Sequence, residues 1–327
     1  KSANGASFAQ HVAPIYPIHR HDPLTGEYLK DRDGNLIYDH DSSRPFTPKY
    51  NPIELAYKDL SVTERDVLVT RSFIDLKPVE GLKLTLNVNY DQTNLRSKTR
   101  YAKGTGDQPQ GSLYYSSDRV TTLTANQLAN YSRSFGDHEL DALLGHESSA
   151  YRYASLEGSK EYLKFLTIDE LGHYTKVGSL GSSTTNYNKE SYFGRLNYSY
   201  DKRYNASVSF RRDGSSRFVR KHRWGNFWSV GAGWNISSEA FMRDLTWIDE
   251  LKLRGSHGQT GNDHLNSFFP YQTLYSLGSD NLEEPGLRTE HLGNVDLTWE
   301  TQVSSDIALE FGLFHRLRGS IELFNKE

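Results

Sequence analysis

The sequence predicts an all-β protein that forms part of a transmembrane antiparallel β-barrel. Three observations predict this fold class: apolar and polar residues alternate along several segments, the connections between these segments are alternately short and long, and no run of apolar residues exceeds three. A spanning helix would need about 20 largely apolar residues in succession. The sequence therefore contains no candidate transmembrane helix.

The alternation is clearest at residues 82–90, where Leu82, Leu84, Leu86, Val88 and Tyr90 share one parity and lysine, threonine and asparagines share the other. A two-residue period of this kind is typical of a strand with one apolar face. The same period recurs at 192–200, 204–211, 228–236 and 307–313.

This interpretation yields ten strands, with residues 238–245 as a short helical turn. In chain order the strands are expected at 66–76, 82–93, 118–133, 138–152, 189–200, 204–213, 224–236, 249–258, 298–313 and 317–325.

The connections between these strands differ in length. Short links fall at 77–81, 134–137, 201–203 and 312–316, and a medium link falls at 237–248. If successive strands are antiparallel, all long links lie at the other end of the sheet. Short periplasmic turns and long extracellular loops distinguish an outer-membrane barrel from a soluble sandwich. The long links are 94–117, 153–188, 214–223 and 259–297.

The composition agrees with this architecture. Mean hydropathy is −0.70, which a barrel tolerates because only alternate residues of each strand face lipid. The formal charge of −3 gives no basis for nucleic-acid binding. An aromatic content of 13% argues against disorder, and the absence of cysteine excludes disulfides and thiolate metal sites. We expect residues 1–65 to be an extracellular loop region leading into the barrel, and residues 66–327 to form barrel strands.

Several ordered blocks resemble a known family. They read Phe-Arg-Arg-Asp-Gly-Ser-Ser-Arg-Phe at 210–218, Arg-Trp-Gly-Asn-Phe-Trp-Ser-Val-Gly-Ala-Gly-Trp-Asn-Ile-Ser at 223–237, Leu-Lys-Leu-Arg-Gly-Ser-His-Gly-Gln-Thr-Gly-Asn at 251–262 and Asp-Leu-Thr-Trp-Glu-Thr at 296–301. Glu-Ala-Phe-Met follows at 239–242, and Gly-Ser-Ile-Glu-Leu-Phe-Asn-Lys ends the series at 319–326. The succession resembles the barrel of the SusC/RagA family of TonB-dependent outer-membrane transporters. The resemblance is strong over 190–327, looser at 135–145, and present in the Pro-Ile-Tyr-Pro-Ile at 14–18.

The resemblance implies an importer of oligosaccharides or oligopeptides in a Gram-negative outer membrane. Such a protein has a 22-stranded barrel closed by a plug, a SusD-like surface lipoprotein as partner, and energy supplied through TonB. This sequence shows no signal peptide, carboxypeptidase-like domain, plug or TonB box, and it stops after about ten strands. We therefore expect the middle part of a barrel, with TonB engaged by a region outside this chain.

Two groups of side chains are candidate contact residues, and each has a structural alternative. Tyrosines in or beside long loops could stack on cargo or on the lipoprotein, or they could serve as loop packing and interfacial girdle. Arginines around 211–223 could hold an anion such as a lipopolysaccharide phosphate, or they could pair with carboxylates at the barrel rim. The tyrosines are Tyr114, Tyr115, Tyr151, Tyr153, Tyr174 and Tyr187, and the arginines are Arg211, Arg212, Arg217, Arg220 and Arg223.

Metal and catalytic sites are not expected. Residues 31–39 resemble a calcium loop in their acidic spacing, but the glycine is fourth rather than sixth, which favours a tight turn at Asp33-Gly34. His19 and His21, with His11 and His40 nearby, are interpreted as surface residues rather than ligands. No catalytic motif occurs, so we expect neither an enzyme nor a cofactor.

Two other functions remain open. The chain could belong to a passive porin or structural outer-membrane barrel, which a plug and TonB box in the parent gene would exclude. It could also be a soluble all-β carbohydrate-binding module, which would be monomeric in water without detergent.

Overall fold

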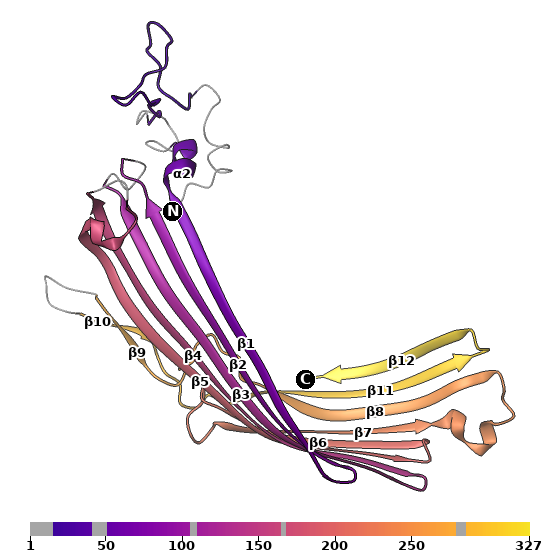
Figure 1. The fold of residues 1–327 in the computed structure, drawn as a ribbon. Coiled ribbons are helices and arrows are strands. Elements are labelled where there is room, and N and C mark those ends of the chain that lie inside the picture. Colours follow the sequence, from indigo (N-terminus) through magenta and orange to yellow (C-terminus); the bar gives the residue numbers. More distant parts are fainter. Residues whose placement is uncertain (1–15, 41–50, 105–109, 165–167, 279–285) are drawn as a thin grey trace. The chain divides into compact units, whose positions relative to one another are not determined.

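A computed structural model describes residues 16–40, 51–104, 110–164, 168–278 and 286–327. Within these residues, ten strands form one sheet in the order β1-β2-β3-β4-β5-β6-β7-β8-β11-β12, and β9 and β10 pair separately (Figure 1). The strands are β1 (Leu60–Val79), β2 (Leu82–Tyr101), β3 (Ser112–Phe135), β4 (His138–Leu163), β5 (Tyr174–Tyr200), β6 (Tyr204–Ser215), β7 (Trp224–Asn235), β8 (Ile248–Asn262), β9 (Leu274–Leu277), β10 (Leu287–His291), β11 (Glu300–Leu313) and β12 (Leu317–Lys326).

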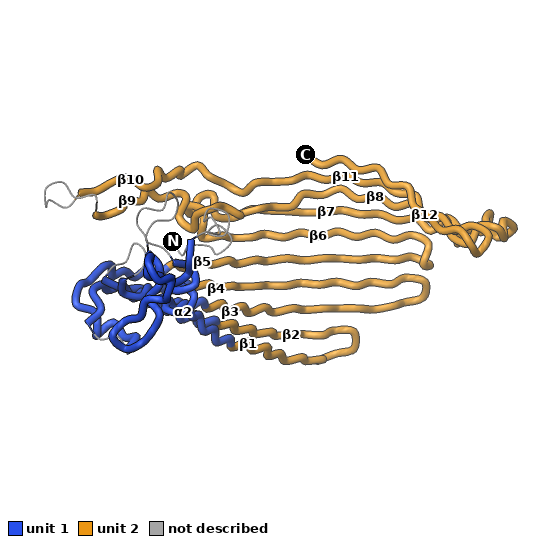
Figure 2. The backbone as a smooth tube through the Cα atoms, turned by 90° about the horizontal axis from the view of Figure 1, so that it is seen from above, with its two compact units in different colours: residues 1–67, 93–120, 153–184 blue, residues 68–92, 121–152, 185–327 orange. Residues whose placement is uncertain are grey.

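The chain divides into two compact units (Figure 2). Unit 1 comprises residues 1–67, 93–120 and 153–184, and unit 2 comprises residues 68–92, 121–152 and 185–327. Unit 1 includes helix α2 (Pro52–Lys58) and the 3₁₀ helix η1 (Leu171–His173), and unit 2 includes η2 (Ile236–Ser238) and η3 (Ala240–Met242). None of the helices in the described part of the chain has the length and apolar character that a membrane crossing requires.

The register of unit 2 gives its sheet two chemically different faces. Leu196 pairs with Val208, and Val208 pairs with Val230, whereas the neighbouring position pairs Asn197 with Ser207. Side chains alternate between the two sides of a sheet, so the first three residues lie on one side and the last two on the other. We call these the apolar face and the polar face. The predicted all-β, antiparallel fold is confirmed.

Aromatic residues mark both ends of the apolar face. At the short-turn end, Tyr200 stacks on Tyr204 and Tyr204 stacks on Trp234, with ring centroids 6.4 Å apart in each pair. Toward the long loops, Tyr192 and Trp224 lie 6.1 Å apart. Trp224 and Trp234 are separated by about 33 Å along β7, which corresponds to about 25 Å for a strand tilted by about 40°. This height matches the apolar band of a transmembrane barrel.

The expected short links are tight turns that suit the twist of the sheet. In the link between β5 and β6, Asp201 and Lys202 have φ of 48° and 53°, and the backbone N–H of Arg203 donates to the carbonyl of Tyr200 at 2.9 Å. Two consecutive positive φ angles define a type I′ turn, which matches the right-handed twist of antiparallel strands. Phe314 and His315, between β11 and β12, repeat these values at 57° and 52°.

The sequence-based strand limits were too short at the long-loop side. Much of 94–117 and of 153–188 is strand, because β2, β3, β4 and β5 extend into these segments, and 259–297 contains β9 and β10. The extensions carry polar residues at both parities. Beyond the apolar band the backbone ladder continues, but neither face must be apolar, so alternation gives no signal there.

The short helical turn expected at 238–245 is present as η3, but one helix was not expected. Helix α2 lies within 1–65, which was expected as loop. The side chain of Asn51 caps α2 by accepting from the N–H groups of Ile53 and Glu54 at 3.2 Å, and Pro52 follows it. This Asn-Pro pair is a recognisable helix start that the strand-based interpretation overlooked.

We predict that Gly81→Ala destabilises unit 2 more than Gly136→Ala does. Both glycines have positive φ, at +80° and +60°, but a Cβ on Gly81 would lie 2.6 Å from the carbonyl oxygen of Ser132, whereas a Cβ on Gly136 would meet nothing within 4 Å. Both variants should lose about 1 kcal/mol from backbone strain, and Gly81→Ala should lose about 1–3 kcal/mol more from overpacking. Thermal unfolding of the full-length protein in detergent checks this, and equal losses would contradict it.

Candidate functional site

Three of the sequence blocks meet at the long-loop end of unit 2, where they build a buried aromatic cluster. Phe227 of β7 packs with Phe218 and Trp299, and the partly buried Leu265 and Leu297 pack against them. Ring centroids are 5.4 Å apart for Phe227 and Trp299, and 5.5 Å apart for Phe218 and Trp299. Because most of these residues lie outside strands, the cluster fastens the loops to the end of the sheet.

Two glycines make room for this cluster. A Cβ on Gly261 would lie 1.9 Å from the ring of Phe227, and a Cβ on Gly225 would lie 2.5 Å from the same ring. Neither glycine has a positive φ, so space rather than backbone conformation requires the missing side chain. Trp299 also donates its indole N–H to the carbonyl of Arg223 at 3.0 Å, which ties the segment before β11 to the segment before β7.

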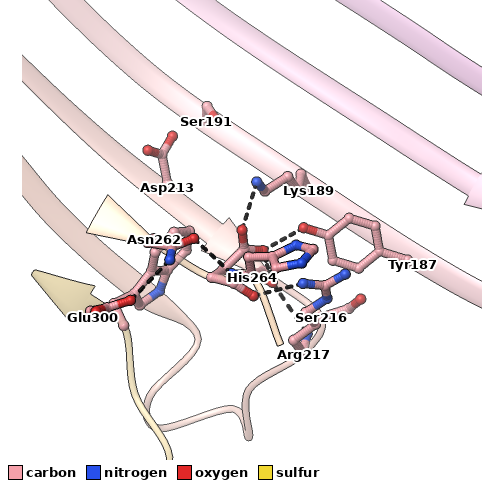
Figure 3. A network of polar contacts seen from close by, with 12 residues as sticks. Tyr187, Lys189, Ser191, Asp213, Ser216, Arg217, Asn262, His264 and Glu300 are labelled. Carbon is pink, nitrogen blue, oxygen red and sulfur yellow. Dashed lines mark hydrogen bonds and ion pairs between the residues drawn. The ribbon is translucent and has the colours of Figure 1, made fainter. Parts of the chain in front are cut away.

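Beside the cluster, Asp263 collects a network of polar contacts (Figure 3). Its buried carboxylate accepts hydrogen bonds from the Tyr187 hydroxyl, from Lys189 Nζ at 2.9 Å and from Ser215 Oγ at 2.8 Å. Its backbone carbonyl accepts from Arg217 Nη1 at 2.8 Å. Asp263 follows β8 directly, so one residue connects the loop after β8 to β5 and to the loop after β6.

The network keeps Asp263 ionised. Burial by itself disfavours the charged carboxylate, but hydrogen bonds from Tyr187, Lys189 and Ser215, together with the charge of Lys189, outweigh it and hold the pKa of Asp263 below its ordinary value. A carboxylate with three donors and a cation beside it is a stable structural centre. The arrangement offers no paired acid and base for catalysis.

Arg217 lies against two aromatic rings in the same network, those of Tyr187 and Phe268, whose centroids are 5.6 Å apart. Its guanidinium carbon is 4.7 Å from the Tyr187 ring centroid and 5.0 Å from that of Phe268. Phe268 in turn stacks on Tyr151 at 5.7 Å. The structure thus brings together Tyr151, Tyr187 and Arg217 of the predicted contact residues. Arg217 is only 8% exposed, which assigns it to loop packing rather than to an open anion site.

The other four tyrosines lie in unit 1 and have different environments. The Tyr114 hydroxyl donates to Glu157 at 2.6 Å, the Tyr153 hydroxyl donates to Asp118 at 2.9 Å, and the Lys98 ammonium lies 5.9 Å from the Tyr115 ring centroid. Tyr174 is 1% exposed and packs with Leu113 and Leu163 in a buried cluster. Its ring is a core element and offers no surface to cargo.

Two of the arginines of 211–223 lie on opposite faces of the sheet, and Arg217, Arg220 and Arg223 lie in the link between β6 and β7. Arg211 lies on the polar face, where its Nε donates to Asp213 at 2.6 Å and its Nη2 donates to Ser191 at 2.9 Å. Arg212, one position on, lies on the apolar face with its guanidinium carbon 5.2 Å from the Trp224 ring centroid. Arg220 is exposed, and the Nε of Arg223 is buried without a hydrogen-bond partner. The five arginines therefore do not form one anion site.

The polar face carries an ionic network that sequence reasoning missed. Arg254 of β8 donates to Glu310 at 2.7 Å, to Glu322 at 3.1 Å and to Asp306 at 3.4 Å, and Lys252 lies 3.3 Å from Glu310. The alternation within each strand could have placed these side chains on the polar side of the sheet. Which of them lie opposite one another depends on the register of β8, β11 and β12, which the sequence does not give. Asp263 and Phe268 were missed because their partners are distant in sequence.

The calcium-like segment is a turn. Asp31 Oδ1 accepts from the N–H groups of Asp33 at 2.9 Å and of Asn35 at 2.8 Å, and Lys30 bridges Leu36 across it. These contacts use the carboxylate internally, as the tight-turn interpretation predicts.

The histidines of this region contact aromatic rings rather than one another. The ring centroid of His19 lies 4.7 Å from that of Tyr38, and the ring centroid of His21 lies 4.4 Å from that of Tyr28. His40 instead contacts the carboxylate of Glu54. Among the described residues, no three metal-ligating side chains are gathered as a site. His11 and residues 14–15 lie outside the described part of the chain.

Comparisons with known proteins support the same architecture. The family described as TonB dependent receptor-like, beta-barrel matches residues 19–327. TonB-dependent receptor P39 of Formosa agariphila is 29% identical over 91% of this chain and 29% of its own length. TonB-dependent receptor SusC of Bacteroides thetaiotaomicron is 31% identical over 61% of this chain and 20% of its own length.

The structure of the RagAB peptide transporter is also similar, with a TM-score of 0.80 and 25% identity over 90% of this chain and 33% of that chain. The RagAB peptide importer in its "open-open" state gives a TM-score of 0.78. This chain thus spans a third or less of these relatives. They are receptors and transporters rather than enzymes, in agreement with the prediction from sequence.

We predict that Gly261→Ala loosens the loops after β8, because the new methyl group would overlap the Phe227 ring. The expected loss of stability is about 1–3 kcal/mol, measured as increased hydrogen exchange of residues 263–270 in the full-length protein. Gly233→Ala is the matched control, because its Cβ would approach no atom closer than 3.8 Å. Adding Phe227→Leu should recover part of the Gly261→Ala loss, and strict additivity of the two changes would contradict the overlap.

We predict an acid-sensitive step in the same loops. Asp263 has a lowered pKa, so its stabilising contribution is present above the ordinary carboxyl range and is lost as pH falls through that lowered pKa. Protection of residues 263–270 from hydrogen exchange should therefore fall below about pH 4.

Asp263→Asn should remove the step and weaken protection at neutral pH by roughly 2–4 kcal/mol, because Lys189 loses its carboxylate. Asp296→Asn is the control, since the ion pair of Asp296 with Lys221 is exposed and should contribute little. An unchanged acid step in Asp263→Asn would assign the step to another group.

Proposed function

Because the chain belongs to the TonB-dependent receptor β-barrel family, we propose that it forms part of the barrel wall of an active importer in a Gram-negative outer membrane. The observation that carries the proposal is the family match over residues 19–327. The two-faced sheet supports it, because an apolar face bounded by aromatic rows suits lipid and a polar face suits an aqueous interior.

For cargo, we propose oligopeptides or oligosaccharides. The support for peptides is the similarity to RagAB, which is described as a peptide transporter. The resemblance to the SusC/RagA family supports a SusD-like lipoprotein as partner and TonB as energy source, the latter acting through a region outside this chain. Tyr114, Tyr115, Tyr151, Tyr153 and Tyr187 remain our candidates for contact with cargo or lipoprotein, whereas Tyr174 is excluded by its burial.

A passive porin is the second candidate. The ionic network of Arg254 on the polar face would suit the wall of a passive pore as well as that of an active importer. A soluble carbohydrate-binding module fits less well, because Leu196, Val208 and Val230 are 40–45% exposed in adjacent strands of the apolar face. Such a patch on a water-soluble monomer would promote association.

Energy coupling separates active import from passive diffusion. We predict that cells expressing the full-length protein take up labelled oligopeptides or oligosaccharides above the level of cells lacking it. Removing TonB, or collapsing the proton-motive force, should abolish this difference while leaving the amount of protein in the outer membrane unchanged. Uptake that persists without TonB would support the porin and contradict active import.

A further inference from the structure

The apolar face of unit 2 is hollowed toward its short-turn side. A groove of about 1180 Å³ is lined by aliphatic side chains, including Leu84, Leu86, Leu144, Leu196 and Val208. Gly194 contributes no side chain there, and a Cβ at this position would already lie 3.1 Å from Leu144 Cδ2. The groove is apolar and open, which suits a hydrocarbon chain better than a polar ligand.

An aromatic row borders this groove on its long-loop side. His146 stacks on Tyr192 at 4.7 Å, and Tyr192 lies 6.1 Å from Trp224. Tyrosine and tryptophan prefer the level where acyl chains meet headgroups, because their rings are amphipathic. The row therefore indicates the depth at which a lipid headgroup would begin.

A second groove, of about 330 Å³, lies on the other side of Trp224. Ser148, Asn188, Ser216 and Arg223 are among the residues that line it, and the Nε of Arg223 is buried without a hydrogen-bond partner. Hydroxyl, amide and guanidinium groups are the donors that a phosphate oxygen requires.

Arg212 adds an unpaired charge at the same level. Its exposed guanidinium lies over Trp224, and within the described residues no carboxylate is paired with it, whereas the neighbouring Arg211 on the polar face is paired with Asp213. Glu190 also lines the second groove, but its carboxylate already accepts from Tyr192 at 2.8 Å and contacts His146 at 3.2 Å. The two arginines, Arg212 and Arg223, outnumber this one carboxylate, so a net positive charge remains available for a ligand.

We propose that the apolar face of β2 to β7 holds one anionic membrane lipid. An acyl chain occupies the aliphatic groove, and the phosphate headgroup binds Arg212 and Arg223 beyond the aromatic row. Along the strands, the apolar groove is followed by the aromatic row and then by the arginines. This order matches that of a membrane lipid, in which the acyl chain is followed by the interfacial region and then by the charged headgroup. The assignment rests on the proposed outer-membrane location, and it concerns the face opposite to the one proposed to line the interior.

Lipid retention by the full-length protein tests the proposal. The purified protein, washed in detergent, is exposed to equal amounts of phosphatidylglycerol and phosphatidylcholine with identical acyl chains, and the retained lipid is identified by native mass spectrometry. The wild type should favour phosphatidylglycerol about 30-fold, as two arginines near a headgroup predict at about 1 kcal/mol each. Arg212→Gln should reduce this preference to about fivefold, and Arg212→Gln with Arg223→Gln should abolish it.

Arg318→Gln is the matched control. Arg318 is also an exposed arginine, but it lies near the short turn at the start of β12, where its backbone is paired with Gly312, and therefore far along the strands from the proposed headgroup site. This variant should retain the wild-type preference.

Equal retention of the two lipids by the wild type, or an unchanged preference in Arg212→Gln, would overturn the proposal. Millimolar inorganic phosphate that displaces the lipid completely would indicate a site for a free anion and would also overturn it. The assay needs no transport, so loss of TonB-dependent uptake would contradict the proposed function without altering this result.

Discussion

The structure depends on the hydrogen-bonded register of antiparallel strands whose residues alternate in polarity. In such a sheet a shift of one residue would move every apolar side chain to the other face, so the register decides what each face can contact. Leu196, Val208 and Val230 align across three strands, and Asn197 and Ser207 align on the opposite side. The same rule separates Arg211 from Arg212. The two adjacent arginines therefore have different environments: Arg211 is paired with Asp213 on the polar face, and Arg212 lies on the Trp224 ring at the edge of the apolar band.

A second constraint acts at the long-loop end, where backbone pairing no longer organises the chain. There the ring of Phe227 occupies the space left by Gly261 and Gly225, and the Asp263 carboxylate accepts from residues of β5 and from the end of β6. Aromatic packing and a buried carboxylate replace the strand ladder as the source of order. The blocks that resemble the SusC/RagA family contribute to this junction, which explains their composition by packing rather than by catalysis.

Much of the fold could be predicted because lipid exposure leaves a regular mark on sequence. Each of the ten strands of the main sheet was expected, and the short turns were located by their length. The extensions of β2 to β5 could not be predicted from sequence. Their residues are polar at both parities, and such a pattern is compatible with a water-exposed strand as well as with a loop. Tyr174 shows the same limit for sites: a loop tyrosine suggests a contact surface, yet its ring is buried against Leu113 and Leu163.

The sequence by itself determined the fold class, the two faces and the family, because each is encoded in local period or in ordered blocks. Tertiary structure alone decided which side chains meet. The hydrogen bonds of Asp263 with Tyr187 and Lys189, the contact of Arg217 with the rings of Tyr187 and Phe268, and the ionic network of Arg254 all join residues that are far apart in the chain. Their partners are set by strand register and loop packing, and neither quantity can be read from the spacing of residues along one strand.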